Sequence, residues 1–328
     1  MSIVFKDSRN ININEIYEFI LNRKRDQDRT EPSSDFKKQT RDYLEWAFNS
    51  FILKNFLAYQ GQELYGWLAL THILPATVII HEWHPLIKLS TNTRQIAIDL
   101  VEKSFHYAHS KGIKNIRVFI DVLEKDQMRF QEIQEIYRQA RMKQTHIALC
   151  MENYSLSVDS LQTIPVPEKL EIVPLLDQEL SKIRKCHKEV FEGTSDGFIA
   201  SLDPDEWVSW NFFDKRILNS SSTVIKNQGE IIGFIAANDY GDYVELGPIG
   251  VLKAYRDHNL GKILMEQCLS SLIQQKKTQC YIEVSEGNIP AYNLYKQYGF
   301  TTVSKKYGFL HRNSNRHDSP NITRNGRE

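Results

Sequence analysis

The stretch that decides how this chain folds is EVSEGNIPAYNLYKQYGF, residues 283–300. A strand-like apolar run ends at Val284, and the chain then turns through Ser-Glu-Gly-Asn. Pro290 suits the first turn of a helix, where its missing N–H costs no hydrogen bond. The stretch therefore predicts a strand, a polar turn and a short helix that carries two tyrosines, Tyr292 and Tyr295.

The first half of the chain contains a fainter version of the same plan. Fixed-order self-similarity is the sequence signature of duplication, whereas single matches also arise by coincidence from common αβ patterning. Three matches occur in the same order: GQELYGWLAL (61–70) with QGEIIGFIAA (228–237), IKNIRVFI (113–120) with KTQCYIEV (277–284), and IYRQARM (136–142) with LYKQYGF (294–300).

The length of 328 residues predicts two domains, since one domain typically takes roughly 100–200 residues. Pro165 and Pro167 interrupt any periodicity, which places a linker between a first domain at 1–157 and a second at 168–312. Residues 313–328 contain almost nothing apolar, and we expect a disordered tail there. Helical and strand patterns interleave in both halves, which predicts an α/β (α+β) fold with a mixed sheet.

Composition argues against several classes of partner. Lys and Arg together number 41, as do Asp and Glu, so the formal net charge is zero and gives no support for binding nucleic acid or a membrane surface. No apolar run approaches the ~20 residues that span a bilayer. The N-terminus has no signal-peptide pattern, so we expect a cytoplasmic protein. The cysteines of the chain form no CxxC pair, and we expect them to be reduced, mostly buried thiols: Cys150, Cys186, Cys268 and Cys280.

The segment HEWH at residues 81–84 invites a metal interpretation because it holds two histidines. On a strand, however, the rings of His81 and His84 would point to opposite faces. We therefore expect no metal site.

A polar turn between a strand and a helix lies within IGVLKAYRDHNLGKILMEQCL, residues 249–269. The strand ends at about Leu252, and an amphipathic helix begins near Leu260. The unpaired N–H groups of a helix N-terminus can converge on a phosphate. Arg256 adds a charged donor, and Gly261 would let the backbone approach a ligand closely. The alternative is a glycine retained only for tight packing.

This turn and residues 283–300 together resemble the GNAT superfamily of N-acetyltransferases, over roughly residues 168–310. The family's first signature, Arg/Gln-x-x-Gly-x-Gly/Ala, matches RDHNLG at 256–261, and the second corresponds to Asn288, Ala291, Tyr295 and Gly299-Phe300. The first signature departs at Asn259, where the family usually has glycine, and Asp257 adds a carboxylate near the phosphate position. Asn enters the left-handed region more readily than other residues except glycine, so we expect the turn to persist. Cofactor affinity is the property that these departures put in question.

The resemblance implies two tandem GNAT-like domains, each with a mixed, mostly antiparallel sheet flanked by helices, and acetyl-CoA or another acyl-CoA as co-substrate. The pantetheine would pair like an added strand with main-chain groups of the strand before the turn. The Gly247-Pro248 break would then splay two strands, although it can also serve only to bend the sheet. The residues implied to bind the cofactor are Ile249, Val251, Arg256, Asp257, His258, Asn259, Leu260, Gly261, Lys262, Asn288, Ala291 and Tyr295.

Acyl transfer from a thioester to an amine needs a base, an oxyanion donor and an acid for the leaving thiolate. The resemblance makes Tyr295 the candidate acid, with Tyr292 as the second candidate and core packing as the alternative role. Glu245 is the candidate base, because a carboxylate on an apolar strand is desolvated and its pKa rises. The alternative is an exposed-face glutamate. A backbone N–H near Val251 would bind the oxyanion, and Asn288 would orient the pantetheine or cap the helix.

The first half of the chain lacks most of these candidate residues. NTRQIA, at 92–97, takes the place of the phosphate turn without any glycine, and RQARM replaces the segment that ends in Gly-Phe. Tyr137 is retained. We expect a degenerate copy that supports the catalytic half.

The leading interpretation is a tandem N-acetyltransferase that acts on a small-molecule primary amine. The alternatives are a non-catalytic acyl-CoA-binding sensor and an aminoacyl transferase that uses charged tRNA, which fits a neutral chain poorly. The segment FEGTSDGFIASLDPDEWVSWNFF, at 191–213, is acidic and aromatic and suggests a cationic acceptor. It can equally be a solvated loop with core aromatics.

Overall fold

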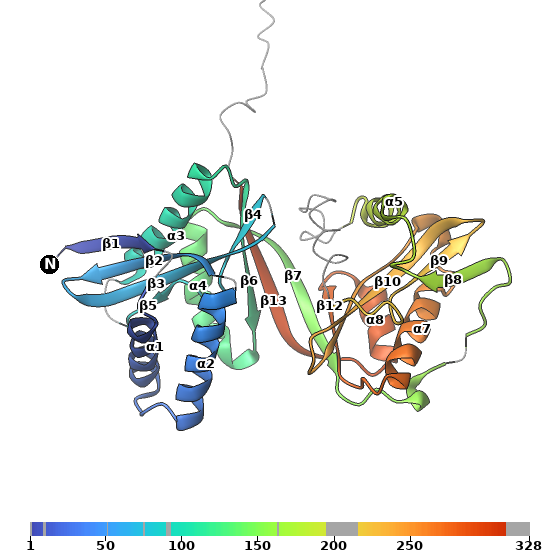
Figure 1. Cartoon of the computed structure of the whole chain (residues 1–328), viewed down its shortest axis with the longest axis horizontal. Coiled ribbons are helices and arrows are strands. Elements are labelled where there is room, and N and C mark those ends of the chain that lie inside the picture. Colours follow the sequence, from blue (N-terminus) through green and yellow to red (C-terminus); the bar gives the residue numbers. More distant parts are fainter. Residues whose placement is uncertain are drawn as a thin grey trace, which may run out of the picture. The chain divides into compact units, whose positions relative to one another are not determined.

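The computed structural model describes residues 2–8, 11–50, 52–74, 76–89, 93–162, 164–194 and 216–312. The expected tail at 313–328 and most of the acidic, aromatic segment at 191–213 lie outside these ranges. Figure 1 shows the order of elements along the chain. Two compact units result: unit 1 comprises Met1–Phe119, Gln131–Lys143 and Phe309–Glu328, and unit 2 comprises Ile120–Phe130 and Gln144–Gly308.

Unit 1 contains a sheet in the order β1-β2-β3-β4-β6, with the short β5 paired to β3. Apolar residues of α1 and α2 pack on one face of the sheet, beside Leu57 and Trp67. Helix α3 covers the other face, where a Cβ on Gly66 would meet Leu100. The elements that lie wholly or mostly in unit 1 are β1 (Ile3–Ser8), α1 (Ile13–Asp28), α2 (Ser34–Ser50), β2 (Ile52–Gln60), β3 (Glu63–Leu74), β4 (Thr77–Ile80), β5 (Leu86–Ile87), α3 (Thr93–Ser110), β6 (Asn115–Val122) and α4 (Gln127–Gln139).

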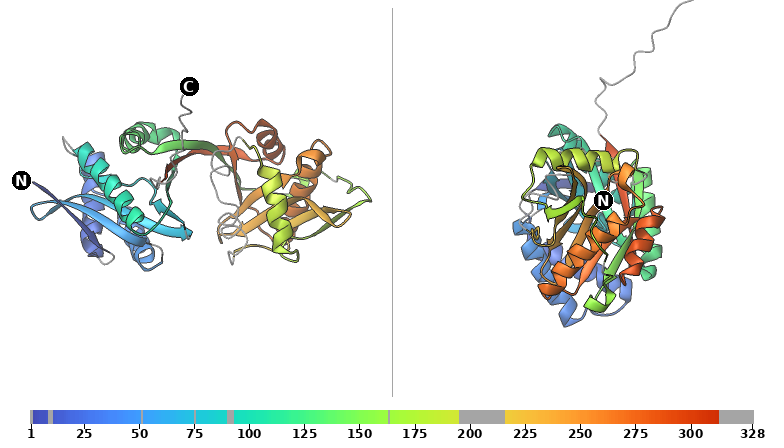
Figure 2. Two further views of the ribbon diagram at one scale, coloured as in Figure 1. Left: turned by 90° about the horizontal axis from the view of Figure 1, so that it is seen from above. Right: turned by 90° about the vertical axis from the view of Figure 1, so that its right-hand side faces the viewer.

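Unit 2 contains a sheet in the order β8-β9-β10-β11-β12-β7, with β13 beyond β7. Helix α5 packs on the face that carries Phe234 and Ala236, and α7 packs on the face that carries Ile235 and Ala237 (Figure 2). The elements that lie wholly or mostly in unit 2 are β7 (Lys143–Asn153), β8 (Leu170–Pro174), α5 (Leu180–Phe191), β9 (Thr223–Asn227), β10 (Glu230–Asp239), β11 (Val244–Val251), α7 (Leu260–Gln274), β12 (Cys280–Ser285), α8 (Ile289–Gln297) and β13 (Thr301–Arg312).

The predicted fold class is confirmed in both units. Each sheet is mixed, because β4 pairs with β6 in parallel and β11 pairs with β12 in parallel, while the other recorded registers are antiparallel. The two halves also share a packing detail. Gly66 on β3 faces α3, and Gly233 on β10 faces Leu264 of α7.

Strand β7 shows that the compact units do not follow the sequence halves. It comes from the first half of the sequence, yet its residues from Gln144 onward lie in unit 2, where Ile282 of β12 pairs with Met151. The ranges 1–157 and 168–312 therefore stay a prediction about sequence domains, and the structure adds that unit 2 draws a strand from the first of them.

The helices of the described ranges include none that is both long and apolar enough to cross a membrane. All four cysteines are buried free thiols, in agreement with the expectation from their spacing.

Candidate active site

The predicted break in β11 is a β-bulge. Ile235 lies opposite Ile249 and Ala237 lies opposite Leu246, so three steps along β11 match two steps along β10. The extra residue falls at Gly247-Pro248, where Gly247 has a φ of 141°. This backbone conformation is open to glycine and strained for other residues. The sequence therefore places its glycine where the bulge requires it.

Beyond the bulge, β11 and β12 diverge. Their parallel register covers Val244 to Leu246 on β11 and stops there, although β11 continues to Val251. The Leu252 N–H donates to the Ile232 carbonyl on β10. Because main-chain groups of a strand alternate in direction, Ile249 and Val251 direct theirs away from β10, toward the side where β12 has diverged. The splay that was predicted from Gly247-Pro248 is present.

The turn after β11 leaves a set of amides without protein partners. Asp257 and Asn259 both adopt left-handed backbone conformations, with φ of 64° and 59°. The first amide that bonds back into the helix is that of Ile263, which donates to the Asn259 carbonyl. In the part of the chain that the structure describes, no backbone N–H of residues 257–262 donates to a protein acceptor. Asn259 thus replaces the family's glycine without loss of the turn.

Gly261 is not required by packing within the protein. A Cβ at this position would meet Leu294 of α8 at 3.6 Å, which is an ordinary van der Waals distance. The alternative interpretation, a glycine retained for tight packing, therefore finds no support in its surroundings.

Arg256 holds the turn in place through two backbone carbonyls. Its Nε donates to the Val251 oxygen at 3.1 Å, and one terminal nitrogen donates to the Val190 oxygen on α5 at 3.0 Å. The guanidinium was expected to serve as a phosphate donor. Its recorded bonds instead connect the turn to β11 and α5, and a role toward phosphate stays a prediction.

The tyrosine helix α8 begins as predicted. The side chain of Asn288 accepts a hydrogen bond from the Ala291 N–H at 3.3 Å and so caps the helix, one of the two roles expected for it. Tyr295 is 3% exposed, and burial raises its pKa, so its hydroxyl is protonated at neutral pH. Within the described residues this hydroxyl makes no recorded hydrogen bond, and its role as an acid stays a prediction.

Glu245 lies half-buried on β11, one residue before Leu246. Its pKa is raised, first by burial and then by the charge of Glu283, as the expectation of a desolvated carboxyl requires. Lys306, a hydrogen bond from Tyr240 and the charge of Arg216 act in the opposite direction. The direction of the shift suits a general base, while the catalytic role itself stays a prediction.

A polar cluster beside Glu245 was missed from the sequence. Lys306 on β13 forms an ion pair with Glu283 on β12 and lies 3.8 Å from the Asp121 carboxylate. The Tyr281 hydroxyl donates to Glu283 at 2.7 Å, and the Cys150 thiol donates to Asp121 at 3.3 Å. The alternation in CYIEV could have placed Tyr281 and Glu283 on one face, but their partners come from strands whose pairing has no local signal.

The corresponding part of the first half is filled by the chain itself. Strand β4 ends at Ile80, and residues 81–85 form a turn before β5. The hydroxyl of Tyr137, the counterpart of Tyr295, donates to the carbonyl of His84 in this turn. Tyr137 is fully buried. The tyrosine hydroxyl thus has a backbone partner in the first half, whereas its counterpart in the second half has none recorded among the described residues.

The geometry expected for HEWH was wrong. His81 and His84 lie in a turn and not on a strand, so their rings stack, with centroids 5.0 Å apart and planes 12° apart. Burial lowers the pKa of His81 to about 4, and the His84 Nδ1 accepts a hydrogen bond from the Ala69 N–H. Across the described ranges, no group of three or more potential ligands that could hold a metal ion is found.

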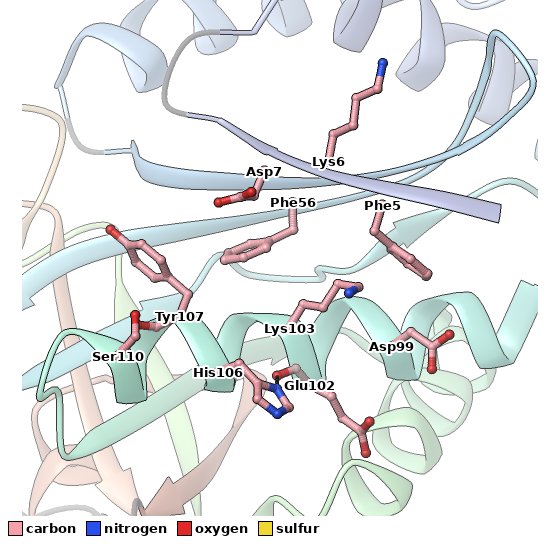
Figure 3. Close-up of a pocket in the computed structure, with 10 residues that line it drawn as sticks. All are labelled: Phe5, Lys6, Asp7, Phe56, Asp99, Glu102, Lys103, His106, Tyr107 and Ser110. Atoms are coloured by element: carbon pink, nitrogen blue, oxygen red, sulfur yellow. Dashed lines mark hydrogen bonds between the residues drawn. The ribbon is translucent and has the colours of Figure 1, made fainter.

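A groove of about 630 Å³ lies elsewhere, in unit 1, between β1, β2 and α3 (Figure 3). Phe5, Phe56 and Tyr107 form its apolar part, and Lys103 lies over the Phe5 ring. Asp7 pairs with a lysine on β2. The groove includes neither a diverging strand pair nor a helix N-terminus. Its size alone therefore does not make it the site of the expected acyl transfer.

Comparison with known proteins agrees with the geometry of unit 2. Residues 187–300 match the model of the acetyltransferase (GNAT) family. The second half of this chain carries a GNAT domain. The match spans the bulge of β11, the turn at 256–261 and α8 up to Phe300. No curated protein matches the sequence.

Solved structures share the fold over nearly the whole chain. A GCN5-related N-acetyltransferase from Sphaerobacter thermophilus is 13% identical, with 94% of this chain and 95% of that chain covered and a TM-score of 0.59. A tandem GNAT protein from the clavulanic acid biosynthesis pathway is 12% identical, with 96% and 100% covered and a TM-score of 0.54. A glucosamine N-acetyltransferase region of a fungal multi-domain enzyme is 12% identical, with a TM-score of 0.60, but only 38% of that chain is covered. At these identities the likeness shows the fold alone.

Proposed function

We propose that this protein is an N-acetyltransferase that moves an acetyl group from acetyl-CoA to a primary amine by direct attack in a ternary complex. The observation that carries the proposal is the turn at residues 257–262, whose amides lack protein acceptors in the described structure. They open α7 beside a strand pair that diverges after Leu246. Free amides at a helix N-terminus suit a diphosphate, and strand-edge groups of Ile249 and Val251 suit the amides of pantetheine.

In the proposed reaction Glu245 accepts one proton as the base and Tyr295 donates one proton as the acid. The ammonium of the acceptor loses a proton to Glu245, directly or through water, because an ammonium has a pKa near ~10.4 and is not nucleophilic. The free amine then attacks the thioester carbonyl, the C–N bond forms, the C–S bond breaks, and the new amide nitrogen releases its second proton to solvent. Tyr295 donates its proton to the leaving thiolate and regains one from solvent. A backbone N–H at Val251, directed away from β10, would bind the oxyanion.

The first test separates binding from chemistry. Calorimetry with CoA should give one binding event per chain, because in the first half the tyrosine hydroxyl and the turn at 81–85 bond to each other. Thiol release from acetyl-CoA should require an amine and should fall in Tyr295→Phe and Glu245→Gln, whereas both variants should still bind CoA. Tyr154→Phe is a matched control, since Tyr154 is 64% exposed.

The alternative function, a non-catalytic acyl-CoA sensor, predicts a different pattern. CoA would bind, but no amine would increase thiol release above the rate of buffer, and Tyr295→Phe would change nothing. An absence of any heat of CoA binding would contradict both functions.

A further inference from the structure

A row of polar side chains crosses the sheet of unit 2 at the point where β11 and β12 are still paired. Asn238 on β10 lies opposite Glu245 on β11, Glu245 lies opposite Tyr281 on β12, and Tyr281 lies opposite Glu152 on β7. Residues opposite each other in neighbouring strands point to the same face of a sheet. This polar row lies on the face away from the α7 and α8 core, which is lined by the alternate residues such as Leu246.

Two members of the polar row have buried oxygen atoms without partners. Asn238 is 6% exposed, and among the described residues its side-chain oxygen has no hydrogen-bond partner. The Oε2 atom of Glu152 is likewise shielded from solvent and has no partner within the ranges that the structure describes. Buried polar atoms are nearly always paired, because an unpaired one keeps the full cost of losing its water. Both atoms are hydrogen-bond acceptors, so the group that would satisfy them is a donor, and beside a carboxylate a cationic donor is favoured.

The charges around the polar row are unequal. Among the described residues, four carboxylates (Glu245, Glu152, Glu283 and Asp121) stand against two cations (Lys306 and Arg216) if all are ionised. Lys306 is engaged with Glu283 and Asp121. Arg216 lies over the ring of Tyr240, 4.2 Å from its centroid. Glu152 and Glu245 therefore have no lysine or arginine ion pair of their own among the described residues.

Tyrosine rings continue this surface. Tyr240 stacks on Tyr243 with centroids 5.2 Å apart, and Tyr243 meets the edge of Tyr281 at 5.9 Å. Aromatic faces attract ammonium groups. Neighbouring strands lie about 4.8 Å apart, so the backbone positions of Glu245 and Glu152, two strands apart, are separated by roughly 10 Å.

We propose that the polar row binds an acceptor that carries two positive charges, with the reacting amine at Glu245 and Asn238 and a second ammonium at Glu152. This proposal rests on the proposed function for the first amine and adds the second charge. It gives the first half of the sequence a direct part in the reaction, because Glu152 belongs to β7. The catalytic half alone would lack the group that distinguishes a diamine from a monoamine.

The test compares 1,5-diaminopentane with n-pentylamine as acceptors. The two chains are equally long, and one charge separates them. The diamine should be preferred by about 10- to 100-fold in kcat/KM, since a charged hydrogen bond is worth roughly 1.5–3 kcal/mol and 1.4 kcal/mol is tenfold. Glu152→Gln should reduce this ratio to about one, and Glu171→Gln, an exposed glutamate on β8, should leave it as in the wild type.

Binding measurements separate this proposal from the proposed function. Calorimetry of each amine with the CoA-bound protein needs no turnover. If no amine is acetylated but the diamine binds at least tenfold more tightly than n-pentylamine, and Glu152→Gln removes that difference, the second-charge site stands and the enzymatic function fails. If acetylation proceeds with equal kcat/KM for both amines in the wild type, or if Glu152→Gln behaves like Glu171→Gln, the second-charge site is overturned. The wild-type comparison decides the matter even if a variant folds poorly.

Discussion

Replacing Gly250 by alanine should disturb β11 through a single contact. A Cβ at this position would lie 2.3 Å from Cγ1 and 3.4 Å from Cβ of Val190 on α5. Real Cβ atoms essentially never approach another heavy atom below 3.0 Å, so a shift of at least 0.7 Å (3.0 minus 2.3) is needed. Rotation of Val190 gives little relief, because its Cγ2 also lies within 3.6 Å and a valine side chain is stiff at χ1.

Neither element can move freely to make this space. The Leu252 N–H bonds β11 to β10, and the Val190 carbonyl accepts from Arg256. Overpacking of this kind typically costs about 1–3 kcal/mol. At roughly 2–4 °C for each kcal/mol in a unit of this size, Gly250→Ala should lower the melting temperature by several degrees. It should also weaken CoA binding, because Ile249 and Val251 flank the substituted position.

A double-mutant cycle tests the cause. Val190→Ala removes both γ-carbon atoms, so in that background Gly250→Ala should cost little, and the coupling free energy should be about as large as the cost of Gly250→Ala alone. Melting temperatures of the four proteins, with CoA affinity by calorimetry, provide the measurement. If Gly250→Ala costs the same with and without Val190, or costs nothing, the contact does not hold β11 in place and the reasoning is wrong.

Three further results are expected. Tyr295→Phe should lower kcat by about 10²–10⁴-fold with CoA affinity unchanged, whereas Tyr137→Phe, which loses a buried hydrogen bond, should lower stability by about 0.5–1.5 kcal/mol and leave turnover intact; equal kinetic effects would contradict the assignment. Burial raises the pKa of Glu245, and its carboxyl can accept a proton only when it is ionised, so kcat/KM should fall as pH drops through that pKa. The folded state favours the protonated carboxyl, so the stability of the fold should decrease as pH rises through the same pKa. Glu245→Gln should remove the acidic limb of the rate profile and become more stable relative to the wild type at pH 8 than at pH 5. Lys306→Met should leave Glu283 without its ion pair and destabilise the protein at neutral pH, by up to about 3–5 kcal/mol if the pair behaves as a buried one, as seen in denaturant titrations; an unchanged midpoint would show that water replaces the lysine.

The parts of the site that the sequence could predict are those set by local backbone chemistry. Gly247-Pro248 predicts a bulge because few residues tolerate the required φ, and the bulge is present. Asn288 predicts a cap because its side chain can reach an amide three residues on, and it does. Asn259 keeps the left-handed turn for the reason that allows asparagine there. Each of these depends on a few consecutive residues.

The parts that the sequence could not predict depend on which strands become neighbours. Nothing in KQTHIALCMEN, residues 143–153, indicates that most of this strand joins β12 of the second half. Strand patterns specify the faces of a strand and leave its partner open. The positions of Glu152 and Lys306 follow from that partner. HEWH failed for a related reason, since its histidines were assigned to a strand that ends at Ile80.

The placement of β7 also bears on why a tandem chain would keep a first half without the phosphate turn. Deleting residues 1–155 would remove β7 and so expose the edge of β12 that now pairs with residues 148–153. It would also remove Cys150 and Glu152 from the face that carries Glu245. A second half expressed alone would therefore have an unpaired, partly apolar strand edge, which favours aggregation. The first half is in this view a structural component of unit 2, since its strand β7 pairs with β12.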